Sequence, residues 1–479
     1  MLAFLCLKAE DHERTSKKRI DLAEWPFVTI QVATYNEGYV VARLLESCLK
    51  VNYPEDKFEI VVVDDSIDET ISILRDYEKR YYPKIKVIHR GARAGYKAGA
   101  LNEALKNSRG EFILVLDADS VLEPNFLRKT IPFFLADEKL SFIQGKLKYL
   151  NDDESWLTKA LAFANDWFAN FLQSSFSKCN MTVGFTGHGG IFRRKSLEDI
   201  GGWTNNTIAE DLDIAYRLQL RGWRALYLED AVSFEEVPPN YYSAVIRFKR
   251  HFKGSLQNLI KYWRPIIRHR SLSIPKKIEA LMQLAYPLVY PLGLICLVLT
   301  LLTYLIIPGV VIDGFWHSII GFISSSLILI SFPCIAPIIS LIPSLLIILL
   351  VLAFSSIFSS KFREIMRGAT LTNIRVVLGL LLIWYDNILN CLSSIAEILT
   401  GKRGEWIPTE RSLRKSTLLN RGKRKKEAIL RIIVSMLVIL FFVNILSRNF
   451  SLNSLGVLFP AALWLYSAYL IIKNGITKK

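Results

Sequence analysis

Short apolar runs alternate with amphipathic segments over the first half of the chain. The amphipathic segments repeat their apolar residues every three to four positions, as helices do, whereas the short runs are rich in β-branched residues and indicate strands. The expected helices lie near residues 40–49, 71–81 and 96–107. The expected strands are residues 27–34, 58–65, 84–90 and 111–120. This alternation predicts an α/β fold with a mostly parallel sheet, covered by helices on both faces.

Long apolar runs dominate the second half of the chain, and about 20 apolar residues are enough to cross a bilayer. The runs that meet this requirement are residues 281–307, 428–445 and 455–472. Residues 316–358 are longer and contain three prolines, so we expect one bent crossing there. Residues 376–399 include Asp386 and are expected to be interfacial or re-entrant. The pattern therefore predicts about four spans.

Basic residues flank these apolar runs at 261–277, 361–367 and 420–428. Because cytosolic loops carry an excess of Lys and Arg, we expect all three segments and the globular half on the cytosolic side of a cell membrane. The formal net charge of +16 then reflects contact with membrane lipids. Nucleic acid is not an expected partner, since no motif for binding it occurs. The six cysteines form no CxxC pair, so neither a zinc site nor a disulfide framework is predicted.

The segment of residues 244–263, just before the first long apolar run, predicts an amphipathic helix on the membrane surface. Its apolar stripe at helical spacing consists of Phe248, Phe252, Leu256, Leu259, Ile260 and Trp263. Arg247, Arg250 and His251 fall together on another face, at positions i, i+3 and i+4. Membrane attraction alone does not require this grouping, so a chemical role is also open.

Polar residues gather where the predicted strands end, which is where ligands bind parallel sheets. The first strand ends in Thr34, Tyr35, Asn36 and Glu37, the second in Asp64 and Asp65, and the fourth in Asp117 and Asp119. Carboxylates at one sheet edge repel each other unless a cation joins them, and Asp-x-Asp suits Mg²⁺ or Mn²⁺ carrying substrate phosphates. The alternative is that single aspartates cap the following helices and turns.

A glycine-rich stretch at residues 90–105 places Lys97 at the start of a helix, where phosphate is favoured. It is neither a P-loop nor a GxGxxG segment, which argues against a dinucleotide enzyme. Further along, Thr207 and Glu210 have the spacing of a capping box. That pattern leaves Asp211 unexplained, and its position at the sheet-facing start of a helix suits a general base.

The ordered series of motifs resembles the family 2 glycosyltransferases, in the membrane-embedded branch of cellulose synthases, mannan synthases and ceramide glucosyltransferases. The resemblance runs from about residue 28 to residue 412 and into the final spans. The matching residues are Asp64-Asp65, Lys97-Ala98-Gly99, Asp117-Ala118-Asp119, Ala209-Glu210-Asp211, Arg247 to His251, and Trp406 to Arg411. The resemblance implies a GT-A type nucleotide-sugar-binding domain joined to a transmembrane bundle.

The resemblance also implies roles for these residues. Asp211, beside Glu210, would take the proton from the acceptor hydroxyl, and a single base with direct displacement predicts inversion to a β-linkage. Asp117 and Asp119 would hold Mg²⁺ or Mn²⁺ on the diphosphate. The residues expected to contact the UDP- or GDP-sugar are Thr34, Tyr35, Glu37, Asp64, Asp65, Lys97, Asp117, Arg247, Arg250 and Arg411.

The chain departs from the family pattern on the acceptor side. Ala209 replaces a threonine, Arg247 a glutamine, and His251 a tryptophan that offers a stacking face to the acceptor sugar. His188 stands where the family has a small hydroxyl residue. His188 and His251 are therefore the expected acceptor contacts. Arg411 follows a segment that resembles the gating loop of the synthases; the alternative is an ordinary charge beside the membrane.

We expect four regions: a membrane-proximal tail at 1–27, a GT-A domain at 28–240, amphipathic interfacial helices at 241–277, and a transmembrane region at 278–479 with a gating-like loop near 401–415. The predicted function is metal-dependent, inverting glycosyl transfer to a polysaccharide. The alternatives are transfer of one sugar to a membrane lipid or to a polyprenyl phosphate, which needs no strong base. A non-catalytic nucleotide-sugar-binding subunit would be expected to lose Asp119 or Asp211, and both are present.

Overall fold

Eight strands form one sheet in the N-terminal half of the computed structural model, in the order β3-β2-β1-β4-β7-β6-β8-β5. The structure describes residues 24–166, 170, 172–295, 374–401, 421–446 and 458–473. The strands are β1 (Val28–Thr34), β2 (Phe58–Asp64), β3 (Ile85–His89), β4 (Phe112–Asp117), β5 (Val121–Leu122), β6 (Leu140–Tyr149), β7 (Gly190–Arg193) and β8 (Arg224–Glu235). The four strands predicted from the sequence are β1 to β4, and each lies within its predicted range.

The sheet is parallel in one half and mixed in the other. The β3-β2-β1-β4 half is parallel throughout, as predicted. Beyond β4, strand β7 pairs antiparallel with both β4 and β6, β6 and β8 are parallel, and β5 closes the edge antiparallel to β8. The prediction of a mostly parallel sheet therefore holds only for the first half, because the strands of the second half pair over long sequence separations.

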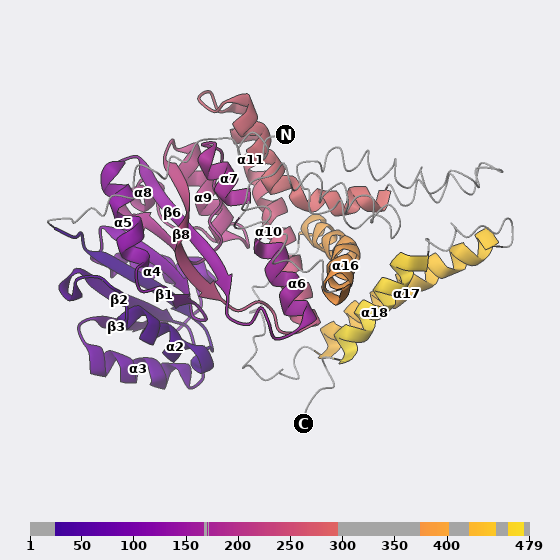
Figure 1. Cartoon of the computed structure of the whole chain (residues 1–479), viewed down its shortest axis with the longest axis horizontal. Helices are drawn as coiled ribbons and strands as arrows, with labels where there is room; N and C mark the ends of the chain where they lie inside the picture. Colours follow the sequence, from indigo (N-terminus) through magenta and orange to yellow (C-terminus); the bar gives the residue numbers. More distant parts are fainter. Residues whose placement is uncertain are drawn as a thin grey trace.

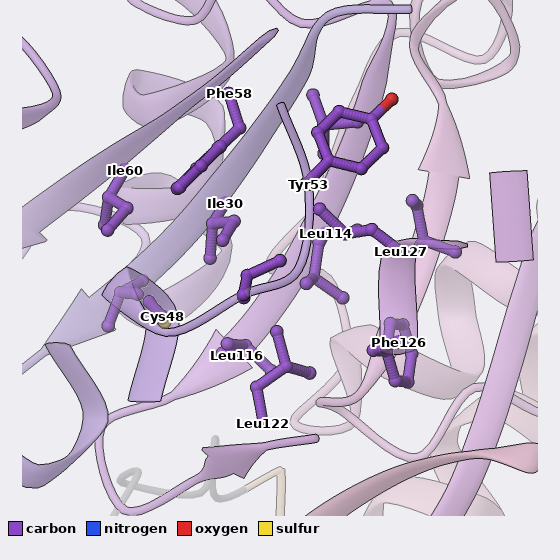
Figure 2. Close-up of a cluster of buried hydrophobic side chains, with 14 of the residues drawn as sticks. Ile30, Cys48, Tyr53, Phe58, Ile60, Leu114, Leu116, Leu122, Phe126 and Leu127 are labelled. Carbon is purple, nitrogen blue, oxygen red and sulfur yellow. The ribbon is translucent and has the colours of Figure 1, made fainter. Parts of the chain in front are cut away.

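Alternate residues of the parallel strands face two separate cores, as the two-residue period of a strand requires. On one face, Ile30, Ile60 and Leu114 pack against α2, α3 and α5 (Figure 2). On the other face, Ile113 and Val115 pack against α4, α8 and α9. Burial on both faces explains why these strands read as continuous apolar runs in the sequence.

Eight helices of the described part of this half surround or adjoin the sheet (Figure 1). They are α2 (Gly38–Leu49), α3 (Thr70–Tyr81), α4 (Tyr96–Lys106), α5 (Phe126–Ala136), α6 (Trp156–Asn165), α7 (Gln173–Lys178), α8 (Arg194–Asp199) and α9 (Glu210–Leu220), with the 3₁₀ turn η2 (Glu55–Lys57). The predicted helices are α2, α3 and α4. Helix α9 begins at Glu210 and buries Tyr216 and Leu218, while Asp211 lies half-buried at its start.

The predicted amphipathic segment lies within one helix of 28 residues, α10 (Tyr241–Arg268). It runs between the sheet domain and α16 (Figure 1). Its apolar stripe divides: Phe252 is buried against Tyr286 and Tyr290 inside the protein, whereas Ile260 and Trp263 are exposed. Part of the predicted stripe is therefore buried between two parts of the protein, and the rest of it is exposed at the surface.

The remaining described helices lie beside α10 or beyond it (Figure 1). They are α11 (Ile274–Ala285), the 3₁₀ turn η4 (Tyr286–Leu288), α16 (Ile374–Leu399), α17 (Arg421–Leu446) and α18 (Leu458–Lys473). Among the described residues, the stretches long and apolar enough to cross a membrane are Ile274–Ile295 and Leu378–Leu399. The first overlaps the predicted span at residues 281–307, while α17 and α18 cover most of two further predicted spans as helices.

Residues 376–399, which are predicted to be interfacial or re-entrant, belong to one continuous helix, α16. Arg431 of α17 contacts both carboxylate oxygens of Asp386 at 2.7 Å. The paired charge explains how an acid sits in an apolar helix. The tail at 1–23, the predicted bent crossing at 316–358, and the gating-like loop from 402 onward with Arg411 lie outside the described residues.

Leu114, at the centre of β4 and fully buried, provides a test of the core. We expect Leu114→Ala to destabilise the domain by about 2–5 kcal/mol, because the buried side chain leaves a cavity. The measurement is the thermal melting temperature of the purified protein in detergent. Leu135→Ala is the matched control, since Leu135 is 45% exposed; equal losses for the two variants would contradict this view of the core.

Candidate active site

A cavity of about 450 Å³ opens at the carboxyl ends of β1 and β4. The start of α9 forms one wall and α10 another, while η4 and α16 close a further side. The predicted site residues that line it are Thr34, Tyr35, Glu37, Asp65, Lys97, Asp117, Asp119, His188, Glu210, Asp211, Arg247, Arg250 and His251. Two predicted residues are missing from this group: Asp64 lies behind the wall, and Arg411 is outside the described residues.

Lys97 joins the acids of two different elements at the centre of the cavity. Its ammonium group lies 2.5 Å from an Asp117 carboxylate oxygen and 3.9 Å from Glu210. It also donates to the Gly187 carbonyl at 2.8 Å. Burial alone would lower the pKa of Lys97, but the carboxylates of Asp117, Glu210 and Asp211 raise it above its ordinary value. Lys97 is therefore a fixed positive charge between the end of β4 and the start of α9.

The two acids at the start of α9 hold their protons more tightly than usual. Burial raises the pKa of Glu210 to about 7, although the charge of Lys97 opposes this and that of Asp211 adds to it. Burial also raises the pKa of Asp211, against the opposing charges of Lys97 and Arg250. Carboxylates with raised pKa values inside a cavity are suited to proton transfer near neutral pH.

The predicted capping box at Thr207 and Glu210 is wrong. The residue before the helix is Ala209, which offers no side-chain cap, and Thr207 donates to the Ala209 carbonyl instead. The helix begins two residues later than a capping box with Thr207 requires. Glu210 is consequently the first helical residue and faces Lys97 rather than reaching back to the chain.

Helix α10 touches the segment just before α9 at very short range. A Cβ atom on Gly254 would lie 2.5 Å from the Ala209 side chain, so only glycine allows this approach. The Gln257 side chain accepts from the Ile208 N–H at 2.9 Å, and Asn258 donates to the Ala209 carbonyl at 3.2 Å. Because α9 has no cap of its own, α10 provides the contacts that hold its start in place.

Two arginines contact predicted site residues at one edge of the cavity. Arg90 contacts both oxygens of Asp65, at 2.7 and 2.5 Å. Arg93 lies over the ring of Tyr35, with the guanidinium carbon 3.5 Å from the ring centre. A side chain in such a stack presents a flat, charged surface, which is suited to a nucleotide.

Asp64, a predicted nucleotide contact, is fully buried and does not line the cavity. Its carboxylate accepts from Thr34 Oγ1 at 2.8 Å and from the Ser66 N–H at 3.2 Å, and contacts His89 at 2.9 Å. These partners occupy both oxygens of the carboxylate. Asp64 therefore supports Thr34 from below instead of facing the cavity.

Arg247 and His188 converge on Glu235 at the end of β8. Arg247 contacts one Glu235 oxygen at 3.1 Å and His188 Nε2 the other at 3.3 Å. His188 is only 2% exposed, and its other ring nitrogen lies 3.2 Å from Ser120 Oγ. Burial alone would raise the pKa of Glu235, but Arg247 and His188 hold it below its usual range. His188 thus lines the cavity from within a buried network.

Arg250 and His251 face the cavity from the same turn of α10 as Arg247. The charge of Arg250 lowers the pKa values of Glu210 and Asp211. His251 lines the open part of the cavity, where loss of solvent and the charges of Arg247 and Arg250 lower its pKa. A neutral imidazole presents both a donor and an acceptor, which suits contact with sugar hydroxyls.

The acids at the end of β4 fit a metal that arrives with a substrate. Among the described residues, no three His, Cys, Asp or Glu side chains lie close enough to hold an ion by themselves. Asp117 and Asp119 both line the cavity. Two carboxylates with phosphate oxygens are the usual protein share of a Mg²⁺ site, so this pair fits a diphosphate-bound ion rather than a resident one.

Sequence reasoning missed several cavity residues. Glu235 ends β8 and Glu236 follows it, and the same strand-end rule that selected Asp117 applies to them once β8 is recognised as a strand. Tyr286, Tyr290 and Trp384 form an aromatic wall on η4, its continuation and α16. No sequence signal separates these aromatic residues from others in the apolar runs, because their place depends on how distant helices pack.

The family follows from the sequence motifs and this geometry together. A family model described as "Glycosyl transferase family group 2" matches residues 112–358, more than half of the 479 residues. The chain belongs to this family, as the ordered motifs predicted.

Curated relatives include glucomannan 4-beta-mannosyltransferase 2 of Arabidopsis thaliana, which is 33% identical over 265 residues, covering 53% of this chain and 49% of that protein. The probable glucomannan 4-beta-mannosyltransferase 4 of Oryza sativa subsp. japonica is 30% identical over 305 residues, covering 62% and 55% respectively. The chain thus spans about half the length of these relatives.

A solved structure with a similar fold is the mannosyltransferase PcManGT from Pyrobaculum calidifontis, in complex with GDP-Man and Mn²⁺. The two superimpose with a TM-score of 0.51 at 22% identity, covering 84% of this chain and 96% of that one. This likeness confirms the predicted GT-A type α/β domain.

The contact between α10 and α9 gives a direct test. We expect Gly254→Ala to lower stability by about 1–3 kcal/mol, because the added methyl group overpacks against Ala209. Gly293→Ala is the matched control: nothing lies within 4 Å of its added Cβ, and alanine favours a helix over glycine. Melting temperatures of both variants check this, and a Gly254→Ala variant as stable as the parent would refute the close contact.

Proposed function

We propose that the protein is an inverting glycosyltransferase that moves a mannosyl group from a nucleotide-diphosphate donor, such as GDP-mannose, to a β-linked polysaccharide. The arrangement of Glu210 and Asp211 opposite Lys97 and Asp117 in one cavity is the observation that carries this proposal. The names of the similar proteins support the sugar: several are glucomannan mannosyltransferases, and PcManGT holds GDP-Man.

Asp211 is the proposed general base. It lies at the start of α9, close to Gly187 across the cavity, and its Oδ1 accepts from the Leu212 N–H at 2.8 Å. That bond orients the carboxylate and leaves Oδ2 toward the cavity. A raised pKa makes Asp211 a stronger base, able to accept the acceptor hydroxyl proton as that oxygen attacks the anomeric carbon.

Lys97 and Arg250 are the proposed stabilisers of the leaving diphosphate. Negative charge builds on the diphosphate as the bond to the sugar breaks, and fixed cations in a cavity stabilise that charge strongly. Tyr35 and Arg93 would hold the nucleotide at the cavity edge. A divalent ion held by Asp117 and Asp119 would add Lewis-acid stabilisation of the diphosphate when bound. The Mn²⁺ of PcManGT supports this choice of cofactor.

The aromatic wall supports an extended acceptor at a membrane. Tyr290 and Trp384 carry the cavity away from Asp211 toward α16, which contains a candidate membrane span. Aromatic faces bind sugar rings through their apolar sides. The second candidate is transfer of a single sugar to a membrane lipid, which the same apolar wall also favours. Product size and extractability into organic solvent separate the two.

Replacing the proposed base tests the mechanism. We expect Asp211→Asn to reduce kcat by about 10²–10⁴-fold, because the amide cannot take the proton, while the affinity for GDP stays unchanged. Radiolabelled mannose transfer in isolated membranes and a GDP-binding titration measure the two quantities. Asp76→Asn, on the surface helix α3, is the control. Full activity in Asp211→Asn would remove Asp211 as the base.

The paired acids also predict a pH profile. Because the ionised pair is the active form and its pKa is raised, kcat/KM should rise with pH and level off above about pH 7. Glu210→Gln removes the neighbouring negative charge, so the pKa of Asp211 falls and the acid limb moves to lower pH. Rates measured across the neutral range for both proteins check this. A limb that stays in place would show that the two acids do not titrate together.

A further inference from the structure

Helix α10 uses separate faces for the cavity and for the outer helices. Arg247, Arg250 and Gly254 lie on the side that faces the cavity and α9. Lys249 and Lys253, four residues apart and so on one side of the helix, point instead to α16 and α17. The basic residues of α10 are therefore divided between two tasks, and neither lysine is placed for attraction to a lipid surface.

Lys249 is tied to both outer helices. Its ammonium group pairs with Glu427 of α17 and donates to Ser393 of α16 at 3.0 Å. Its backbone carbonyl accepts from Ser394 at 3.2 Å. The Glu427 carboxylate is held in turn by Arg431 at 2.8 Å, and Arg431 pairs with the buried Asp386 described above. The attachment of Lys249 thus continues into a fully buried ion network.

Lys253 repeats the arrangement one turn further along α10. It donates to Glu397 of α16 at 2.8 Å, and its side chain is only 4% exposed. The pair stands apart from the Arg431 network, since Glu397 lies near the end of α16. A buried ammonium group is costly unless it is paired, and this pair holds Lys253 to Glu397, whose side chain is 45% exposed. Two such pairs, one turn apart, resist rotation of α10 about its own axis.

The rotation of α10 about its axis also determines where Arg250 lies in the cavity. Successive residues of a helix are 100° apart, so a small turn of α10 moves Arg250 sideways relative to Glu210 and Asp211. It would also disturb the contacts that Gly254 and Asn258 make with Ala209. Both the cation and the acids of the cavity thus depend on the orientation of one helix.

We propose that Lys249 and Lys253 are positioning residues, whose pairs with Glu427 and Glu397 set the orientation of α10 and hold Arg250 against Glu210 and Asp211. This inference rests on the proposed transferase function. It makes the helices beyond α10 part of the catalytic machinery, since they fix a group that they do not themselves carry. Neither lysine contacts the cavity, so any effect of its loss on catalysis travels through α10.

Charge reversal at the Lys253 pair tests the proposal. We expect Lys253→Glu to lower kcat per folded enzyme by about tenfold or more, with the KM for GDP-mannose within about threefold, because Arg250 acts mainly on charge that develops during reaction. Adding Glu397→Lys restores an opposite pair and should bring kcat back to within about threefold of the parent. Lys249→Met is a second variant, expected to lower kcat in the same way.

Arg264→Glu is the matched control, since Arg264 is an exposed residue of the same helix. It should leave kcat unchanged within about twofold. Folded protein is counted by size-exclusion chromatography, so that a loss of folding is not mistaken for a loss of turnover. A lysine with only a structural role would lower the yield or the melting temperature and leave kcat per folded enzyme at the parent value.

Hydrogen exchange of the α10 amides gives a readout independent of activity. Residues 247–254 should exchange faster in Lys253→Glu, return to the parent rate in the charge-swapped double variant, and stay unchanged in Arg264→Glu. If the parent transfers no sugar but exchange follows this pattern, the proposed function fails and the anchoring of α10 stands. Unchanged exchange and unchanged kcat in Lys253→Glu, or a swap that restores neither, would overturn the inference.

Discussion

Two adjacent carboxylates inside a cavity can be ionised only when cations lie close to them. This requirement determines how the elements around the cavity are arranged. Glu210 and Asp211 start the same helix, and Lys97 and Arg250 approach them from α4 and from α10. The cations must come from separate elements, because one helix cannot surround its own first turn. The sheet edge, α9 and α10 are therefore bound to each other by charge as well as by apolar packing.

The parallel half of the sheet and its active edge were predictable from sequence because they depend on local signals. Strand β4 reads as a buried apolar run that ends in Asp117, and the helix after Gly95 brings Lys97 to the same edge. These relations follow from the two-residue period and from strand-end geometry. Nothing in them needs knowledge of distant pairing.

The rest depended on long-range contacts. Asp64 looks like a ligand by position, but it is buried behind the cavity and contacts Thr34, Ser66 and His89. Thr207 has capping-box spacing, yet contacts from α10 move the helix start to Glu210. The lysines of α10 resemble membrane-facing charges until their partners, more than a hundred residues away, are seen. Local spacing cannot reveal which partner a polar group finds.

The close approach of Gly254 to Ala209 also limits how this sequence is free to vary. Position 254 already holds the smallest residue, so no substitution there can make space for a larger residue at position 209. A threonine at position 209, as in the family pattern that the sequence resembles, would add atoms beside this contact with α10. Positions 209 and 254 are therefore expected to change together among close homologues. Substituting Ala209 alone to match the family motif would leave the contact with position 254 unadjusted.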